Sequence, residues 1–193
     1  MVYGKDESFF TLKGMLEALF EKFNTPLPEF IPGGIEAFHP TRKAVITIYG
    51  KTAGWIGQLH PEVGEALDIP ANVRVYAAQL EVDALLCGAG APLTVKPLPK
   101  YPGSARDIAL VVDAAALSGD IKKTIAASGG KLLQSAELFD TYIGDKLPEG
   151  KKSLAYTLEF RSDERTLTDD EVAAAMEKIL SALEEKHGAV LRS

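Results

Sequence analysis

The sequence predicts an α+β protein in two parts, each built on a largely antiparallel sheet. Three observations lead to this prediction. Strand-like segments alternate with amphipathic helical segments, a stretch rich in Pro and Gly divides the chain, and the second part orders its elements as strand, helix, strand, strand, helix, strand. Pro and Gly sustain neither a helix nor a central strand, so we expect parts at residues 1–90 and 104–193, with a linker at 91–103.

The first part begins with an amphipathic helix that Pro26 and Pro28 end. A β-rich segment, Ala44–Tyr49, then meets a Gly50-Lys51 turn signal, and the following residues return as the second strand of a hairpin. A short helix starting at Pro61 and a strand over 73–82 follow. The apolar stripe predicted for the first helix comprises Leu12, Met15, Leu16, Leu19, Phe20 and Phe23.

The second part shows the alternation expected of strands with one core face and one open face. Ile108, Leu110 and Val112 alternate with smaller or polar residues. The segment 131–144 is long for one strand, so we expect a bend or bulge in it. Thr168–Glu171 has the spacing of a capping box, which predicts a helix start. The order is that of a ferredoxin-like fold, whose helices share one sheet face and leave the other open.

Composition narrows the class of function. The chain has 193 residues, 46% of them hydrophobic, and a net charge of −6. Up to residue 96 there are 8 basic and 11 acidic residues, and beyond it 13 and 16, so each part carries −3. This balance argues against a sequence-independent nucleic-acid binder, which needs clustered Lys and Arg. We see no membrane span or signal peptide, and the single cysteine, Cys87, fits the reducing cytoplasm.

No motif indicates a catalytic or metal centre. Gly50-Lys51-Thr52 resembles the end of a phosphate-binding loop, but Val45 stands where that loop needs a glycine. The histidines His39, His60 and His187 lack metal-ligand spacing, and no G-x-S-x-G elbow is present. The sequence therefore predicts a chain without an active site or a bound metal.

Tyr142 is the residue with the least obvious structural role. If Phe139 and Ile143 face the core, the two-residue period sends Tyr142 to the open face. An exposed aromatic ring can stack on a nucleobase without any net positive charge. Taken alone, this tyrosine and the scattered basic residues around it fit a solvated surface better than an RNA-binding one.

Four blocks of the second part together resemble a known family. These are Arg106–Val112, Leu138–Tyr142, Leu147–Tyr156 and Arg165–Val172. In this order and spacing they resemble the ferredoxin-fold anticodon-binding domain at the end of the β subunit of bacterial phenylalanyl-tRNA synthetases. The resemblance spans about residues 98–193.

The first part resembles the region just upstream in the same subunits, through Phe10–Gly14, Phe38–Arg42 and Trp55–Val63. In the family this region ends a catalytic-like module with the class II synthetase fold and no active site. The resemblance thus implies that residues 1–90 are a partial module, continued upstream, and that the chain corresponds to the C-terminal quarter of a longer subunit.

The resemblance also implies a function. Such enzymes are α2β2 heterotetramers that use ATP and magnesium to attach phenylalanine to its tRNA, and this segment would bind the anticodon stem-loop of tRNA(Phe) without performing chemistry. The family's stacking tyrosine maps onto Tyr142, and residues 102–106 would lie beside it. Ala105 replaces a bulkier or basic family residue, which puts a contact there in doubt. The implied RNA-binding residues are Tyr142, Arg106, Ser104, Lys146, Lys151 and Lys152.

Two rivals remain open. Regulatory amino-acid-binding modules of the ACT type share the same element order, but they have a glycine-rich loop after the first strand, where Ala114–Gly119 offers one glycine. The other rival is a purely structural role in subunit assembly, with no RNA contact.

Overall fold

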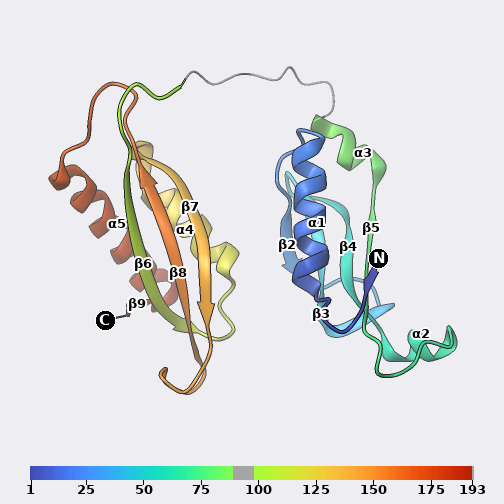
Figure 1. Cartoon of the computed structure of the whole chain (residues 1–193). Helices are drawn as coiled ribbons and strands as arrows, with labels where there is room; N and C mark the ends of the chain where they lie inside the picture. The colour runs from blue at the N-terminus through green and yellow to red at the C-terminus, as the bar shows by residue number, and fades with distance from the viewer. Residues whose placement is uncertain (89–97, 193) are drawn as a thin grey trace. The chain divides into compact units, whose positions relative to one another are not determined.

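The computed structural model describes residues 1–88 and 98–192. The chain divides into two compact units, Met1–Thr94 and Val95–Ser193 (Figure 1). Residues 91–97 of the predicted linker lie outside the described residues. Each unit is described by itself.

The first unit is a five-stranded antiparallel sheet with the order β1-β5-β4-β3-β2 and a helix, α1, packed on one face. The predicted first helix, hairpin, short helix and following strand are confirmed. The edge strands β1 and β2 were not predicted, because they are short. The elements are β1 (Val2–Tyr3), α1 (Phe9–Lys22), β2 (Glu29–Pro32), β3 (Phe38–Ile48), β4 (Lys51–Leu59), α2 (Pro61–Ala66), β5 (Val75–Leu80), α3 (Val82–Leu85) and the 3-10 turn η1 (Leu86–Gly88).

Helix α1 begins with a capping box in which Ser8 and Thr11 each accept a backbone N–H from the other residue. Its buried side chains lie four residues apart and contact the sheet; they are Leu12, Leu16 and Phe20. The predicted stripe is too wide, since the side chain of Met15 is 53% exposed. A single sheet face covers a narrower strip of the helix than the apolar residues occupy.

The β3–β4 hairpin turns at Tyr49 and Gly50, and Ile48 pairs with Lys51 across the turn. Both central residues have positive φ, 49° and 73°, as a type I′ turn requires. Glycine adopts this conformation without the cost that a Cβ atom imposes. Glycine at position 50 therefore suits this turn.

We expect two glycine substitutions in the first unit to act in opposite directions. Gly50→Ala lowers the free energy of unfolding by about 1–2 kcal/mol, because alanine must adopt the left-handed region. Gly14→Ala raises it by about 0.5–1 kcal/mol, because Gly14 lies inside α1 with no atom within 4 Å of an added Cβ. The single tryptophan of the chain, Trp55, lies in β4, so its fluorescence in a urea titration reports on this unit. Equal changes in the free energy of unfolding for both variants would contradict the different backbone conformations assigned to Gly50 and Gly14.

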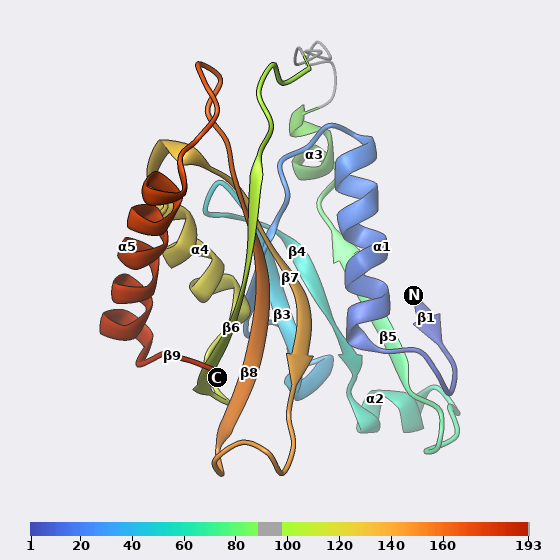
Figure 2. The same ribbon diagram turned by 60° about the vertical axis from the view of Figure 1, so that its left-hand side comes forward.

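The second unit is a four-stranded antiparallel sheet with the order β7-β8-β6-β9. Helices α4 and α5 lie together on one side of it (Figure 2). This arrangement confirms the predicted ferredoxin-like order and leaves the other sheet face without a helix. The elements are β6 (Ser104–Asp113), α4 (Ser118–Ser128), the 3-10 turn η2 (Gly130–Leu132), β7 (Leu133–Tyr142), β8 (Lys151–Phe160), α5 (Asp169–His187) and β9 (Val190–Leu191).

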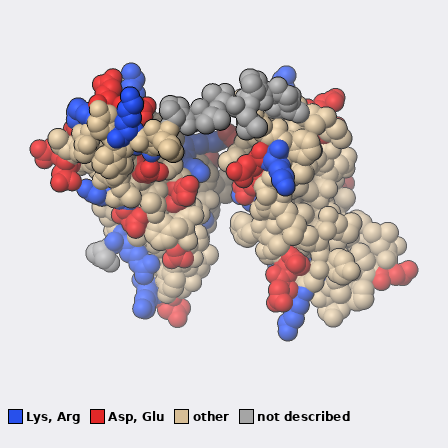
Figure 3. All heavy atoms as spheres, turned by 45° about the horizontal axis from the view of Figure 1, so that its top comes forward, with Lys and Arg blue, Asp and Glu red and all other residues tan. Residues whose placement is uncertain are grey.

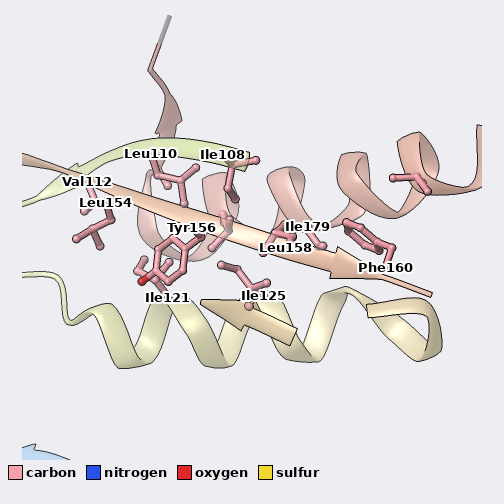
Figure 4. Close-up of a cluster of buried hydrophobic side chains, with 14 residues drawn as sticks. Ile108, Leu110, Val112, Ile121, Ile125, Leu154, Tyr156, Leu158, Phe160 and Ile179 are labelled. Atoms are coloured by element: carbon pink, nitrogen blue, oxygen red, sulfur yellow. The ribbon is translucent and has the colours of Figure 1, made fainter. Parts of the chain in front are cut away.

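The core of this unit lies between the sheet and the two helices (Figure 4). Alternate residues of β8 are at most 1% exposed, namely Leu154, Tyr156, Leu158 and Phe160. The helices contribute Ile121, Ile125, Val172, Ile179 and Leu183. The Tyr156 hydroxyl donates a 2.9 Å hydrogen bond to the Ser118 carbonyl, and burial raises the pKa of Tyr156. The buried hydroxyl of Tyr156 therefore has a hydrogen-bond partner.

The predicted capping box at the start of α5 is confirmed. The Glu171 backbone N–H bonds to the Thr168 hydroxyl, and the Thr168 backbone N–H donates to the Glu171 carboxylate at 3.0 Å. Arg165 adds a second donor to the same carboxylate, with Nη1 at 2.7 Å from Oε2. The hydrogen bond from Arg165, and after it the backbone N–H of Thr168, lower the pKa of Glu171 to about 2.

This cap makes the stability of the second unit pH-dependent. Folding lowers the pKa of Glu171 from its model-peptide value of 4.5, so its contribution is present above that value and is lost as the pH falls towards 2. We expect Glu171→Gln to lower the thermal midpoint at pH 7 and the deficit to shrink below about pH 5. Thermal melts followed by circular dichroism across this pH range measure the difference in thermal midpoint. Arg165→Gln should lower the thermal midpoint with the same pH trend, and combining it with Glu171→Gln should lower the midpoint little further. A difference in midpoint that stays constant with pH would contradict a stabilising role of the Glu171 carboxylate.

Candidate nucleic-acid interface

The sheet face opposite α4 and α5, called the open face below, is built from alternate residues of three strands. In β6 these are Ala105, Asp107, Ala109, Val111 and Asp113, and in β8 they are Lys151, Ser153, Ala155, Thr157 and Glu159. Ser135, Glu137, Asp140 and Tyr142 of β7 pair with members of the β8 set. Directly paired residues point to the same side of a sheet, so the register defines this face without further assumption.

Tyr142 lies on the open face, because it pairs with Ser153, which in turn pairs with Val111. The prediction of this position assumed that Phe139 and Ile143 face the core, and that assumption is wrong. Phe139 is 59% and Ile143 72% exposed, so neither faces the core. A register shift between Leu138 and Asp140 breaks the two-residue period at Phe139, which confirms the expected bulge.

The Tyr142 ring is half-buried rather than free. A Cβ atom added to Gly144 would lie 2.7 Å from the Tyr142 hydroxyl, so the ring tip rests against this glycine. The guanidinium carbon of Arg192 lies 5.1 Å from the ring centroid, within the range of a cation–π contact. Ser153, opposite the tyrosine, is only 3% exposed. The ring is therefore held in a defined place on the sheet.

Sequence reasoning missed Arg192. It directly follows β9, and its backbone N–H donates to the Ala109 carbonyl at 2.8 Å. The signal that could have found it is the ferredoxin-like order itself, which puts the last strand beside the first. With Leu191 paired to the core residue Leu110, the next residue belongs to the open face.

The three predicted lysines have different surroundings. Lys146 is exposed in the loop between β7 and β8, four residues after Tyr142 in the chain. Lys151 shares the open face, where its Nζ lies 2.6 Å from Oδ1 of Asp113. Lys152 pairs with the buried Val112 and thus points to the helix side, and burial lowers its pKa. Lys151 thus shares the face of Tyr142, whereas Lys152 does not.

Arg106 and Ser104 are not brought together with Tyr142. They pair with the core residues Leu158 and Phe160, so both point to the helix side. Leu158 lies five residues beyond Ser153 on β8, a separation of about 17 Å from the Tyr142 row. Arg106 Nη2 instead lies 3.0 Å from Oδ1 of Asp169, at the start of α5. The resemblance implies that residues 102–106 lie beside Tyr142, but the antiparallel register places Ser104 and Arg106 at the other end of the sheet from the Tyr142 row.

The end of the open face away from Tyr142 is acidic. A shallow depression of about 280 Å³ is lined there by Gly103, Ala105, Ser135, Glu137, Thr157 and Glu159. Asp107 accepts a 2.7 Å hydrogen bond from the Thr157 hydroxyl nearby. Figure 3 shows acidic and basic side chains interspersed on the molecular surface in that view.

Residues 1–88 and 98–192 contain no cluster of three His, Cys, Asp or Glu side chains that could hold a metal ion. No helix in these ranges is long and apolar enough to cross a membrane.

Comparison with known proteins assigns both parts of the chain. Residues 99–192 match the family described as "Ferredoxin-fold anticodon binding domain". Residues 2–82 match the one described as "Phenylalanyl tRNA synthetase beta chain CLM domain". The two matches follow each other along the chain, as the two resemblances seen in the sequence do.

Whole relatives agree with these matches. The chain is 42% identical over 189 residues to the phenylalanine–tRNA ligase beta subunit of Bacillus subtilis (strain 168), which is 97% of this chain and 23% of that subunit. The corresponding subunit of Geobacillus kaustophilus (strain HTA426) gives the same values. That of Streptococcus mutans is 41% identical over 184 residues, 95% of this chain and 23% of its own length. The chain thus spans about a quarter of these relatives, and it belongs to the phenylalanine–tRNA ligase beta-subunit family, as the C-terminal region of such a subunit.

Proposed function

We propose that the second unit of this chain binds the anticodon stem-loop of tRNA(Phe) on its open sheet face, with Tyr142 stacking on an anticodon base. The observation that carries the proposal is the position of Tyr142. It is an aromatic ring fixed on the open face of a domain that belongs to an anticodon-binding family. Base stacking suits this acidic surface because it needs no net positive charge.

The other predicted RNA-binding residues fall into two groups. Lys151 shares the open face with Tyr142 and Lys146 follows Tyr142 by four residues in the chain, so both would contact phosphates of the same loop. Arg106, Ser104 and Lys152 point to the helix side, so they would contact a different part of the RNA. This division predicts that the first group affects stem-loop binding and the second affects the binding of longer tRNA.

For the whole enzyme we propose the activity that the relatives' name states, ligation of phenylalanine to its tRNA. The chain would act in an α2β2 assembly in the cytoplasm, with ATP and magnesium bound by other parts of the enzyme. Residues 1–90 would end a catalytic-like module of the class II synthetase type, residues 91–103 would link the two parts, and residues 104–193 would form the RNA-binding domain.

The direct test is filter binding of the full chain to the tRNA(Phe) anticodon stem-loop at low, stated salt. The competitor is the same stem closed by an unrelated loop, because it keeps the phosphate charge and changes the bases. We expect the first RNA to bind more tightly than the competitor. Equal binding of both RNAs, or no binding, would contradict recognition of the anticodon loop by this chain.

The same preparation separates the two rivals. Calorimetric titration with amino acids gives heat only if the unit is a regulatory module of the ACT type. If neither an amino acid nor the stem-loop binds, a role in subunit assembly remains.

A further inference from the structure

Helix α1 of the first unit has a second row of residues that points away from the sheet. The row of buried side chains that packs on the sheet starts at Leu12 and repeats every four residues. Two positions earlier starts a row of exposed residues with the same spacing, which consists of Phe10, Gly14 and Ala18. Two positions correspond to a rotation of about 200° around a helix, so these residues, called the outer row below, lie opposite the buried ones.

The outer row and its border are apolar although they face solvent. The side chain of Phe10 is 75% exposed, and Met15, at the border of the row, is 53% exposed. The Phe10 ring contacts the edge of the Phe9 ring, with the two centroids 5.5 Å apart. A helix with apolar residues on both sides is typical of a helix packed between two layers. The described residues of the first unit provide one of these layers, the sheet.

Gly14 is the residue of the outer row without a local explanation. A glycine inside a helix lowers the stability of that helix relative to alanine. Its φ is not positive, and a Cβ atom added to it would meet no atom within 4 Å, so neither the backbone nor the described packing requires glycine here. Small residues at a helix contact allow the axis of a second helix to come close. Gly14 and Ala18 thus form a notch of the kind that a crossing helix fills.

We propose that the outer row is the docking surface of an α-helix from the upstream part of the same β subunit, which crosses α1 at Gly14. The inference rests on the part of the proposed function that makes residues 1–90 the end of a larger module. The relatives have room for such a helix, since the region shared with the Bacillus subtilis subunit is 23% of that subunit. The helix would present an apolar stripe to Phe10 and Met15 and a basic side chain to the exposed carboxylate of Glu21.

The size of the surface favours this occupant over a second copy of the chain. From Phe10 to Ala18 the outer row is about 12 Å long. A stable interface between separate proteins buries about 800 Å² on each partner, more than a strip of this length and the width of one helix offers. A helix of the same polypeptide needs less area, because the covalent connection keeps its effective concentration high.

The first test measures how fast a thiol at position 18 reacts with iodoacetamide. Ala18→Cys is made in a Cys87→Ser background, because Cys87 is exposed. This chain alone is compared with the whole β subunit, and mass spectrometry counts the modified α1 peptide. We expect labelling to be about a hundredfold slower in the whole subunit, because the packed helix must open before the reagent enters. The control Ala173→Cys, on an exposed position of α5, should react equally fast in both proteins.

The second test uses Gly14→Leu, which should have opposite effects in the two proteins. In this chain alone we expect the thermal midpoint of the first unit to rise by about 3 °C, because leucine is the better helix former and no atom lies within 4 Å of an added Cβ. In the whole β subunit we expect the midpoint to fall by about 3 °C, because the leucine occupies the space of the crossing helix.

Three outcomes would overturn the inference. The first is equal labelling of position 18 in both proteins, or a higher midpoint of both with Gly14→Leu. The second is slow labelling in this chain alone together with sedimentation as a dimer, which would identify a second copy as the occupant. The third is slow labelling that requires the α subunit. The α1 variants should not change binding of the anticodon stem-loop, so failure of stem-loop binding would refute the proposed RNA-binding site and leave the labelling result intact.

Discussion

Tyr142→Ala is expected to lower the affinity of the chain for the anticodon stem-loop by about 1–3 kcal/mol, roughly 5- to 150-fold, which is the range for loss of one base-stacking ring. The ring lies on a surface strand opposite Ser153, so its removal should leave the fold intact. Because the ring carries no charge, the salt dependence of binding should not change. Filter binding at several salt concentrations measures both quantities.

Tyr142→Phe is the matched control for this prediction. It keeps the stacking surface and the contact with Arg192 and removes only the hydroxyl next to Gly144. We expect it to bind within a few-fold of the unchanged protein. A loss as large as that of Tyr142→Ala would show that the hydroxyl, and not stacking, carries the interaction, whereas full binding by Tyr142→Ala would remove this residue from the site.

Phe160→Ala should have the largest effect on stability, about 3–5 kcal/mol lost from the second unit. Phe160 ends β8 with no exposed surface and belongs to the cluster between sheet and helices (Figure 4). The cost combines lost burial with the cavity left behind. Urea unfolding followed by far-ultraviolet circular dichroism should show it as an earlier transition, while the Trp55 fluorescence transition of the first unit stays in place.

Phe139→Ala removes the same ring from the neighbouring strand and serves as the comparison. Phe139 sits at the bulge of β7 and is 59% exposed. Its loss should cost well under 1 kcal/mol, as is usual for surface positions. Comparable destabilisation by the two variants would contradict the placement of the core. A shift of the Trp55 transition by Phe160→Ala would mean that the two units do not unfold separately.

Local patterns sufficed for much of the fold. Strand alternation identified Ile108, Leu110 and Val112 as the buried face of β6, and the Thr168–Glu171 spacing located the start of α5. The Gly50 turn signal placed the β3–β4 hairpin. In each case the physical cause lies within a few residues of chain, which is why the sequence alone reveals it.

The site depended on relations between distant segments, and sequence reasoning handled these less well. Arg106 follows the pattern of a strand entry near the site, yet the antiparallel pairing with Leu158 sends it to the helix side. Arg192 has no motif of its own and becomes notable only when β9 pairs with β6. The position of Tyr142 was inferred through Phe139, whose bulge breaks the period on which the inference relied.

The most direct test of RNA binding by the open face is a nuclear magnetic resonance titration of the labelled chain with the tRNA(Phe) anticodon stem-loop. We expect the largest amide shifts at Tyr142, Ser153 and Arg192, with smaller shifts at Lys146 and Lys151. Residues of the first unit and of the outer surfaces of α4 and α5 should not move. Shifts confined to the helix side, or none at RNA concentrations that saturate the filter assay, would contradict anticodon binding on this face.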